Sequence, residues 1–125
     1  MFTHVMVGSN APEKARNFYR AALGALGYEA HEMGNHTFFG DGDAHFIVGP
    51  PRDGEAACHA NGGTIGFKAK STAEIHAFHA AGVANGGTCE GEPGSRPNSP
   101  GQPYAAYLRD PDGNKIGAFT PDPNN

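Results

Sequence analysis

The stretch YAAYLRDPDGNKIGAF (Tyr104–Phe119) decides the fold. Its apolar residues predict a strand that ends at an Asp-Pro-Asp-Gly turn, and a second strand then runs to Phe119. Asp and Asn side chains in such a turn bond the local backbone, and Gly113 takes the positive-φ position. Gly117 lies midway along the second strand, a good position for a metal ligand or a catalytic acid, yet it carries no side chain.

A predicted strand followed by a predicted helix occurs twice along the chain. A strand in FTHVMVG precedes the helical segment NAPEKARNFYRAALGAL, for which Asn10 is the predicted cap. A strand in GTIGFKAK precedes a second helix, for which Ser71 and Glu74 form a capping box. The buried positions predicted for this second helix each lie 60 positions after those of the first: Ile75, Phe78, His79, Gly82 and Val83 follow Ala15, Phe18, Tyr19, Ala22 and Leu23. The register predicts an internal duplication of one strand–helix–meander unit.

We expect one α+β domain built from these two units. Module one covers about residues 1–51, a connector follows at 52–62, and module two covers about 63–120. The short segments YEAHEMG, HTFFGDG and AHFIVGPP predict an antiparallel meander in module one. Two such sheets side by side, with their helices outside, form a concave cleft, and small ligands usually bind in clefts of this kind.

Composition and charge exclude several classes of function. The formal net charge is -4 and the Lys and Arg residues are scattered, which argues against a nucleic-acid partner. The sequence has no apolar run long enough for a membrane span, and its first residues lack the pattern of a signal peptide. Cys58 and Cys89 show no Cys-x-x-Cys spacing and no Cys/His cluster around them, so we expect reduced thiols in a cytoplasmic protein.

Together these segments resemble the vicinal oxygen chelate superfamily, which includes glyoxalase I, extradiol dioxygenases, fosfomycin resistance enzymes and bleomycin resistance proteins. The resemblance rests on HVMVGSNAPEKARNFYRAALGALGY, GFKAKSTAEIHAFHAAGVANGG and YAAYLRDPDGNKI, and covers essentially the whole chain. It implies two paired βαβββ modules that form an incomplete barrel around a cleft, commonly assembled as a homodimer. It also implies a small-molecule ligand or substrate.

Metal-using members of the superfamily hold a divalent ion with one ligand on the first strand and one on the last strand of each module. Only His4 matches this pattern, because its counterpart 60 positions later is Thr64. Gly117 stands where the final acid is expected, and the last strand of module one offers Phe46 or Ile47. A single imidazole does not hold a divalent metal against water at useful affinity. We therefore expect no metal and no other cofactor, and room in the cleft beside Gly117.

The loop-like segment Cys89–Tyr104 is too long and too rich in Pro and Gly for a tight hairpin, so we expect it to form a flap across the cleft mouth. Arg96 is its only cation. By resemblance to one subgroup Arg96 contacts an anion or a carbonyl of the ligand; alternatively, it pairs with Glu90 or Glu92 and orders the loop. The two tyrosines of the next strand have odd spacing, so one of them lines the cleft.

Two functions are compatible with these residues. We expect a glyoxalase/bleomycin-resistance-family protein that binds a small molecule without a metal, in a cleft formed around His4, Thr64, Arg96, Tyr107 and Gly117. The alternative is a metal-dependent lyase or dioxygenase of the glyoxalase type that uses His4 with non-standard ligands such as His36 or His45. His4 is a general base if the protein is an enzyme, and a hydrogen-bonding group if it only binds its ligand.

Overall fold

A computed structural model describes residues 1–40 and 42–124, which form an α+β fold with two similar halves. The first half contains β1 (His4–Gly8), α1 (Pro12–Gly24), β2 (Ala30–Met33), β3 (His36–Phe39) and β4 (His45–Gly49). The second half contains β5 (Ile65–Lys68), α2 (Thr72–Ala84), β6 (Thr88–Ser95), β7 (Pro103–Arg109) and β8 (Lys115–Pro121). The predicted duplication of a βαβββ unit is confirmed.

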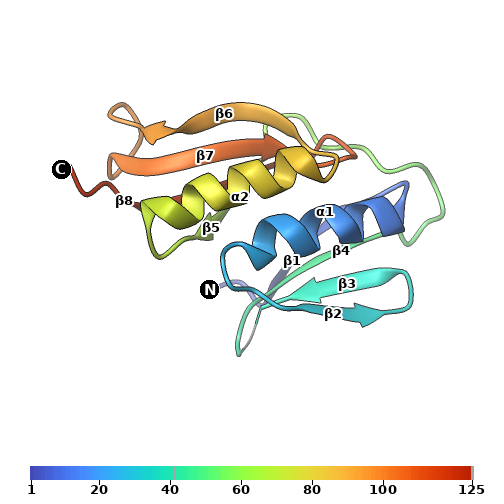
Figure 1. Ribbon diagram of the computed structural model, residues 1–125. Coiled ribbons are helices and arrows are strands. Elements are labelled where there is room, and N and C mark those ends of the chain that lie inside the picture. The colour runs from blue at the N-terminus through green and yellow to red at the C-terminus, as the bar shows by residue number, and fades with distance from the viewer. Residues whose placement is uncertain (41, 125) are drawn as a thin grey trace.

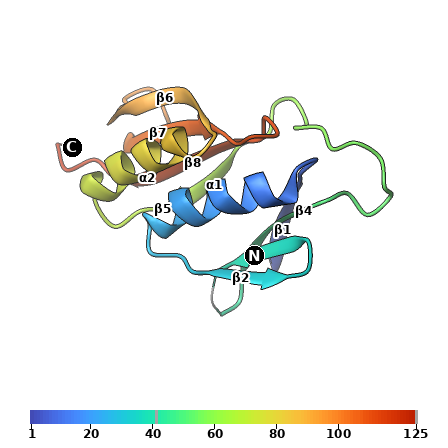
Figure 2. The ribbon, with the colours of Figure 1, turned by 45° about the vertical axis from the view of Figure 1, so that its right-hand side comes forward.

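Each half folds into its own mixed sheet of four strands. The strand orders are β1-β4-β3-β2 and β5-β8-β7-β6, and only the first pair in each sheet is parallel among the described strands. The two sheets do not close into a barrel, so the barrel is incomplete, as the resemblance implied. Figures 1 and 2 show α1 and α2 side by side, covering the same side of the two sheets.

The helices bury most of the positions that the repeat predicts. The predicted positions of α1 are all fully buried: Ala15, Phe18, Tyr19, Ala22 and Leu23. In α2, Ile75, Phe78 and Gly82 are buried, but Val83 is 47% exposed, so the prediction is wrong there. The reason is that α2 contacts the sheet mainly through β7 and β6, and this contact leaves Val83 uncovered. At 13 residues each, neither described helix is long and apolar enough to cross a membrane.

One of the two predicted helix caps is confirmed. The Oγ atom of Ser71 accepts a hydrogen bond of 3.1 Å from the backbone N–H of Glu74, as a capping box requires. Asn10 does not cap α1, because Ala11 occupies that position. The amide of Asn10 instead exchanges two hydrogen bonds with the backbone of Ala57, and so ties the connector to the start of α1.

The Asp-Pro-Asp-Gly turn joins the two halves. The carboxylate of Asp110 is buried and accepts hydrogen bonds from the hydroxyl of Tyr19 at 2.6 Å and from the backbone N–H of Asn114 at 2.9 Å. The side-chain amide of Asn114 then donates to the carbonyl of Gly8, at the end of β1. The turn between β7 and β8 therefore holds the first helix and the first strand of the other half.

The predicted flap is wrong over most of its length. Residues Thr88–Ser95 form β6, which pairs with β7 at the edge of the second sheet. The pairing shifts register between Cys89 and Gly91 and again between Gly91 and Gly94. An edge strand with such bulges tolerates Pro93, because its N–H side has no partner strand to bond. The Pro and Gly content that favoured a flap is thus compatible with an irregular edge strand.

Candidate functional site

Each sheet has one face covered by the helices and one open face. Residues paired across neighbouring strands share a face, so His4 lies on the same face as His45, and Gly66 on the same face as Gly117. The alternate positions, such as Phe46 and Phe67, pack in or against the core under the helices. The open faces of the two sheets, together with the region where β1 faces β5, form the candidate cleft.

Two pockets lie where β1 faces β5. His4 and His45 line the first together with residues 65–68, and its volume is about 270 Å³. Thr64 and Lys115 line the second, which also has a volume of about 270 Å³. His4 and Thr64 therefore line different pockets. A larger depression of about 570 Å³ beside Tyr28 contains none of the predicted site residues.

Two aromatic rings fill the space beside Gly117. A Cβ atom at residue 117 would lie 2.9 Å from Cε1 of Phe119 and 3.0 Å from Cδ1 of Tyr107. The ring of Phe119 also covers Gly66 on the adjacent strand, where a Cβ atom would lie 2.8 Å from the same Cε1. The prediction of free space beside Gly117 is therefore wrong. Because glycine has no side chain, the rings of Tyr107 and Phe119 pack where a metal-binding side chain would otherwise lie.

Two cations lie over the ring of Tyr107. The Cζ atom of Arg96 is 5.4 Å from the ring centroid, and the Nζ atom of Lys115 is 5.1 Å from it. Each contact at such a partly exposed site contributes about 0.5–1 kcal/mol. Tyr107 in turn meets Phe119 edge to face, with centroids 5.5 Å apart. We call these four residues (Arg96, Tyr107, Lys115 and Phe119) the platform.

Arg96 does not use either of its predicted carboxylate partners in a described contact. Its guanidinium donates to the backbone carbonyls of Glu92 and Ser95, which hold it over Tyr107. Glu90 forms an ion pair of 3.1 Å with Arg109 instead. The Arg96 guanidinium is thus positioned by backbone carbonyls, and both Arg96 and Lys115 are partly exposed.

The predicted site residues come together only in part. Tyr107 and Gly117 are paired across β7 and β8, and Arg96 lies over Tyr107, so these three residues lie together. His4 lies on β1 in the other half, exposed, with its Nδ1 atom 2.9 Å from the hydroxyl oxygen of Thr3. Thr64 is exposed just before β5.

The metal implied by the resemblance does not fit these residues. The four strand positions hold His4, Ile47, Thr64 and Gly117, and the platform rings leave no space for an acidic side chain at residue 117. His45 adds a second imidazole on the open face, but the pair brings no anionic ligand with it. Over residues 1–40 and 42–124, the group of potential metal ligands that comes together, His79, Cys89 and Glu92, lies elsewhere.

Sequence reasoning missed Phe119 and Lys115. The signal was available, because both residues lie two positions from Gly117 on the same strand and so share its face. Lys68 was also missed. It pairs with Phe119 across β5 and β8, so it lies on the same face, and it lines the pocket that contains His4. The second half of the cleft therefore combines aromatic rings with three cations.

Comparisons with known proteins point to one family. The model of the Glyoxalase/Bleomycin resistance protein/Dioxygenase superfamily matches residues 2–117. A glyoxalase/bleomycin resistance protein from Albidiferax ferrireducens is similar in structure, with a TM-score of 0.89, 49% identity, and coverage of 95% of this chain and 98% of that one. No curated protein matched the sequence.

More distant structures are similar in fold alone. A glyoxalase-related enzyme from Fulvimarina pelagi has a TM-score of 0.72 at 15% identity, covering 95% of this chain and 86% of that one. Lactoylglutathione lyase from Agrobacterium tumefaciens has a TM-score of 0.63 at 21% identity, covering 95% of this chain and 92% of that one.

Proposed function

Because the chain belongs to the Glyoxalase/Bleomycin resistance protein/Dioxygenase superfamily, we propose that it binds a small organic anion with a planar apolar part, without a metal ion. The observation that carries this proposal is the platform beside Gly117, where two rings replace a metal-binding acid and two cations lie over one ring. The rings offer apolar contact to the ligand, and Arg96 and Lys115 pair with its charge.

The sign of the charge narrows the ligand class further. Arg96, Lys115 and Lys68 lie on the open face of the second sheet, and Glu90 is neutralised by Arg109. A large cation such as bleomycin favours an acidic cleft, so these side chains oppose its binding. The net charge of -4 does not alter this, because the charges nearest the ligand dominate at cellular ionic strength.

Three probes of the same shape test the proposal: benzoate, benzamide and benzylamine, measured by isothermal titration calorimetry. We expect benzoate to bind the most tightly, and Arg96→Gln to weaken it about tenfold, a loss of about 1.4 kcal/mol. Arg52→Gln, which removes an exposed cation of the connector, is the matched control and leaves binding unchanged. Equal or tighter binding of benzylamine, or equal binding by the Arg96 variant, would contradict the proposal.

A second candidate function is a metal-dependent lyase or dioxygenase of the glyoxalase type, in which His4 acts with non-standard ligands. The observation in its favour is that His4 and His45 are paired across β1 and β4 and line one pocket. Titration with Ni²⁺, Zn²⁺ and Mn²⁺ tests this function. Stoichiometric binding that His4→Ala abolishes would support it over metal-free binding, with His4 then a ligand or a general base.

We also propose a cytoplasmic homodimer. Both cysteines among the described residues are free, which suits a reducing compartment. Large apolar side chains are exposed in the first half: Phe2 at 65%, Met6 at 43% and Met33 at 68%. Exposed apolar groups of this kind are commonly covered by a second copy in an oligomer. We expect no membrane partner and no nucleic-acid partner.

A further inference from the structure

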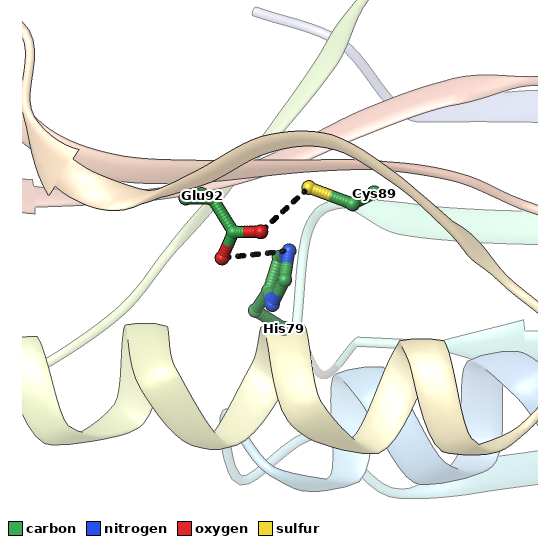
Figure 3. A group of neighbouring side chains, drawn as sticks. All are labelled: His79, Cys89 and Glu92. Carbon is green, nitrogen blue, oxygen red and sulfur yellow. Dashed lines mark hydrogen bonds and ion pairs between the residues drawn. The ribbon is translucent and has the colours of Figure 1, made fainter.

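Three side chains with metal-binding atoms converge between α2 and β6. Figure 3 shows His79 rising from the helix toward Cys89 and Glu92 on the strand. The Sγ atom of Cys89 lies 3.5 Å from one carboxylate oxygen of Glu92, and the Nε2 atom of His79 lies 4.0 Å from the other. All the ligand atoms lie within 4.8 Å of one another. The sequence around Cys89 shows no Cys/His cluster, because His79 comes close to it only in the folded chain.

The irregularity of β6 explains why the sequence concealed this cluster. In a regular strand, Cys89 and Glu92 point to opposite faces, because they are three positions apart. Cys89 pairs with Leu108, whereas Gly91 pairs with Tyr107, so one residue of β6 is unpaired between them and the alternation is reset. Both side chains therefore face α2, on the opposite side of the sheet from the platform.

The histidine has a nitrogen atom that nothing in the described chain satisfies. The side chain of His79 is only 12% exposed, and its Nε2 atom is buried without a hydrogen-bond partner. His79 was predicted to lie on the buried face of the second helix, and its side chain is largely covered there. An unsatisfied buried polar atom destabilises the folded state, and a bound metal ion removes this cost by accepting the lone pair of the ring.

We propose that His79, Cys89 and Glu92 bind Zn²⁺, with a water molecule as the fourth ligand. Imidazole, thiolate and carboxylate are the three ligand types that zinc uses in proteins. Tetrahedral zinc with these bond lengths separates its ligand atoms by about 3.3–3.6 Å. The 3.5 Å from Sγ of Cys89 to one carboxylate oxygen of Glu92 already satisfies this. The 4.0 Å from Nε2 of His79 is to the other oxygen, so the Glu92 carboxylate, whose side chain is 79% exposed, has to turn to bring one oxygen within reach of both partners.

Binding at this site involves no redox step. The Cys89 thiol loses its proton to solvent and the thiolate donates its electron pair to the ion, while the neutral imidazole and the carboxylate donate theirs. The ion would link α2 to the edge strand. This site is independent of the proposed function of the cleft.

Zinc titration of the full chain, freed of metal by chelation and kept reduced, tests the site. We expect one equivalent of Zn²⁺ to bind, and Cys89→Ser and Glu92→Gln each to weaken binding at least tenfold. Glu92 is exposed, so its variant keeps the fold even if a change at Cys89 perturbs β6. Cys58→Ser is the matched cysteine control, and His4→Ala is the control for a metal in the cleft; neither changes the affinity.

Cobalt provides a second readout that does not depend on affinity. Co²⁺ bound by a thiolate gives a sulfur-to-metal charge-transfer band in the near ultraviolet, which we expect for the native chain and for Cys58→Ser but not for Cys89→Ser. The proposal is overturned if no equivalent of zinc binds, if the Cys89 and Glu92 variants bind as the native chain does, or if binding is lost with His4 or Cys58 instead.

Discussion

The ring of Tyr107 lies across the position that a side chain at residue 117 would occupy, with its Cδ1 atom 3.0 Å from the Cβ point of Gly117. The two residues are paired across β7 and β8, so their relation is fixed by the sheet and not by a mobile loop. The strand position where the resemblance places an acid is therefore part of an aromatic surface.

Adding a side chain at residue 117 should disturb this surface. We expect Gly117→Ala to lower the free energy of unfolding by about 1–3 kcal/mol, because the new methyl group displaces Tyr107 and Phe119. Gly24→Ala is the control: its Cβ position is open, and the change should be neutral or stabilising by up to about 1 kcal/mol. Urea denaturation measures both, and equal effects would contradict the packing described.

Restoring the expected acid should not restore a metal site. We expect Gly117→Glu, made together with Cys89→Ser to remove the second site, to bind Ni²⁺ and Mn²⁺ no better than Cys89→Ser alone. The physical reason is that the space is filled and that Thr64 and Ile47 still supply no ligand. Calorimetric titration of the two variants with each metal tests this prediction. Binding of one additional equivalent of metal by the double variant would contradict it.

The aromatic face of Tyr107 should contribute to ligand affinity separately from its hydroxyl. Tyr107→Phe keeps the ring under Arg96 and Lys115, so we expect benzoate affinity within about twofold of the native value. Tyr107→Leu removes the ring, and we expect a loss of about 1–2 kcal/mol in binding free energy. A Phe variant as weak as the Leu variant would assign the effect to the hydroxyl instead.

The pair Tyr19–Asp110 should make stability depend on alkaline pH. Burial raises the pKa of Tyr19 well above its ordinary value of 10.0, and the neighbouring Asp110 carboxylate raises it further. Only the unfolded chain ionises readily as the pH passes about 10, so the free energy of unfolding is constant with respect to this group below that pH and falls above it. Denaturation measured from pH 8 to 11 should show this decline.

Tyr19→Phe removes both the hydrogen bond and the titrating group. At pH 7 we expect a loss of about 1–3 kcal/mol, because the buried Asp110 carboxylate loses one of its hydrogen-bond donors. The alkaline decline should become shallower in this variant. A variant that declines as steeply as the native chain would show that another group is responsible.

The exposed apolar groups of the first half should be covered in a homodimer. We expect light scattering to give twice the chain mass for the native protein and the single mass for Met33→Lys, since a charge in an apolar contact is costly. Val83→Lys, at an apolar residue of α2 that is 47% exposed, is the control and should leave the mass unchanged. A monomeric native protein would contradict the proposed assembly.

Local pattern was sufficient to predict the helices and the hairpin. The buried face of α1 followed from its spacing, and the capping box at Ser71 followed from Glu74 three positions later. The structural role of Asp110 also followed from local turn chemistry, because Asp side chains bond the backbone two positions on. Each of these features depends on neighbours within a few residues.

The failures involve contacts that no local pattern records. The strand β6 was missed because its register shifts interrupt the regular alternation of side chains between the two faces, which is the pattern that identifies a strand in a sequence. The cluster at His79 was missed for the same reason, since Glu92 faces the helix only because of a bulge. The room expected at Gly117 was wrong because a glycine reveals nothing about which rings pack over it. For Phe119, alternation alone would have placed it on the open face.

The hydrogen bonds at the turn between β7 and β8 also bear on the order in which the chain acquires its structure. Tyr19 and Asp110 are 91 positions apart in the sequence. The buried hydroxyl of Tyr19 in α1 can therefore form its hydrogen bond only after the hairpin of β7 and β8 has formed. Contacts between residues so far apart in the sequence slow folding. During translation they cannot form until the second of the two residues has been synthesised. The two repeats therefore should not mature one after the other on the ribosome; we expect them to reach the native state together, in a single cooperative transition.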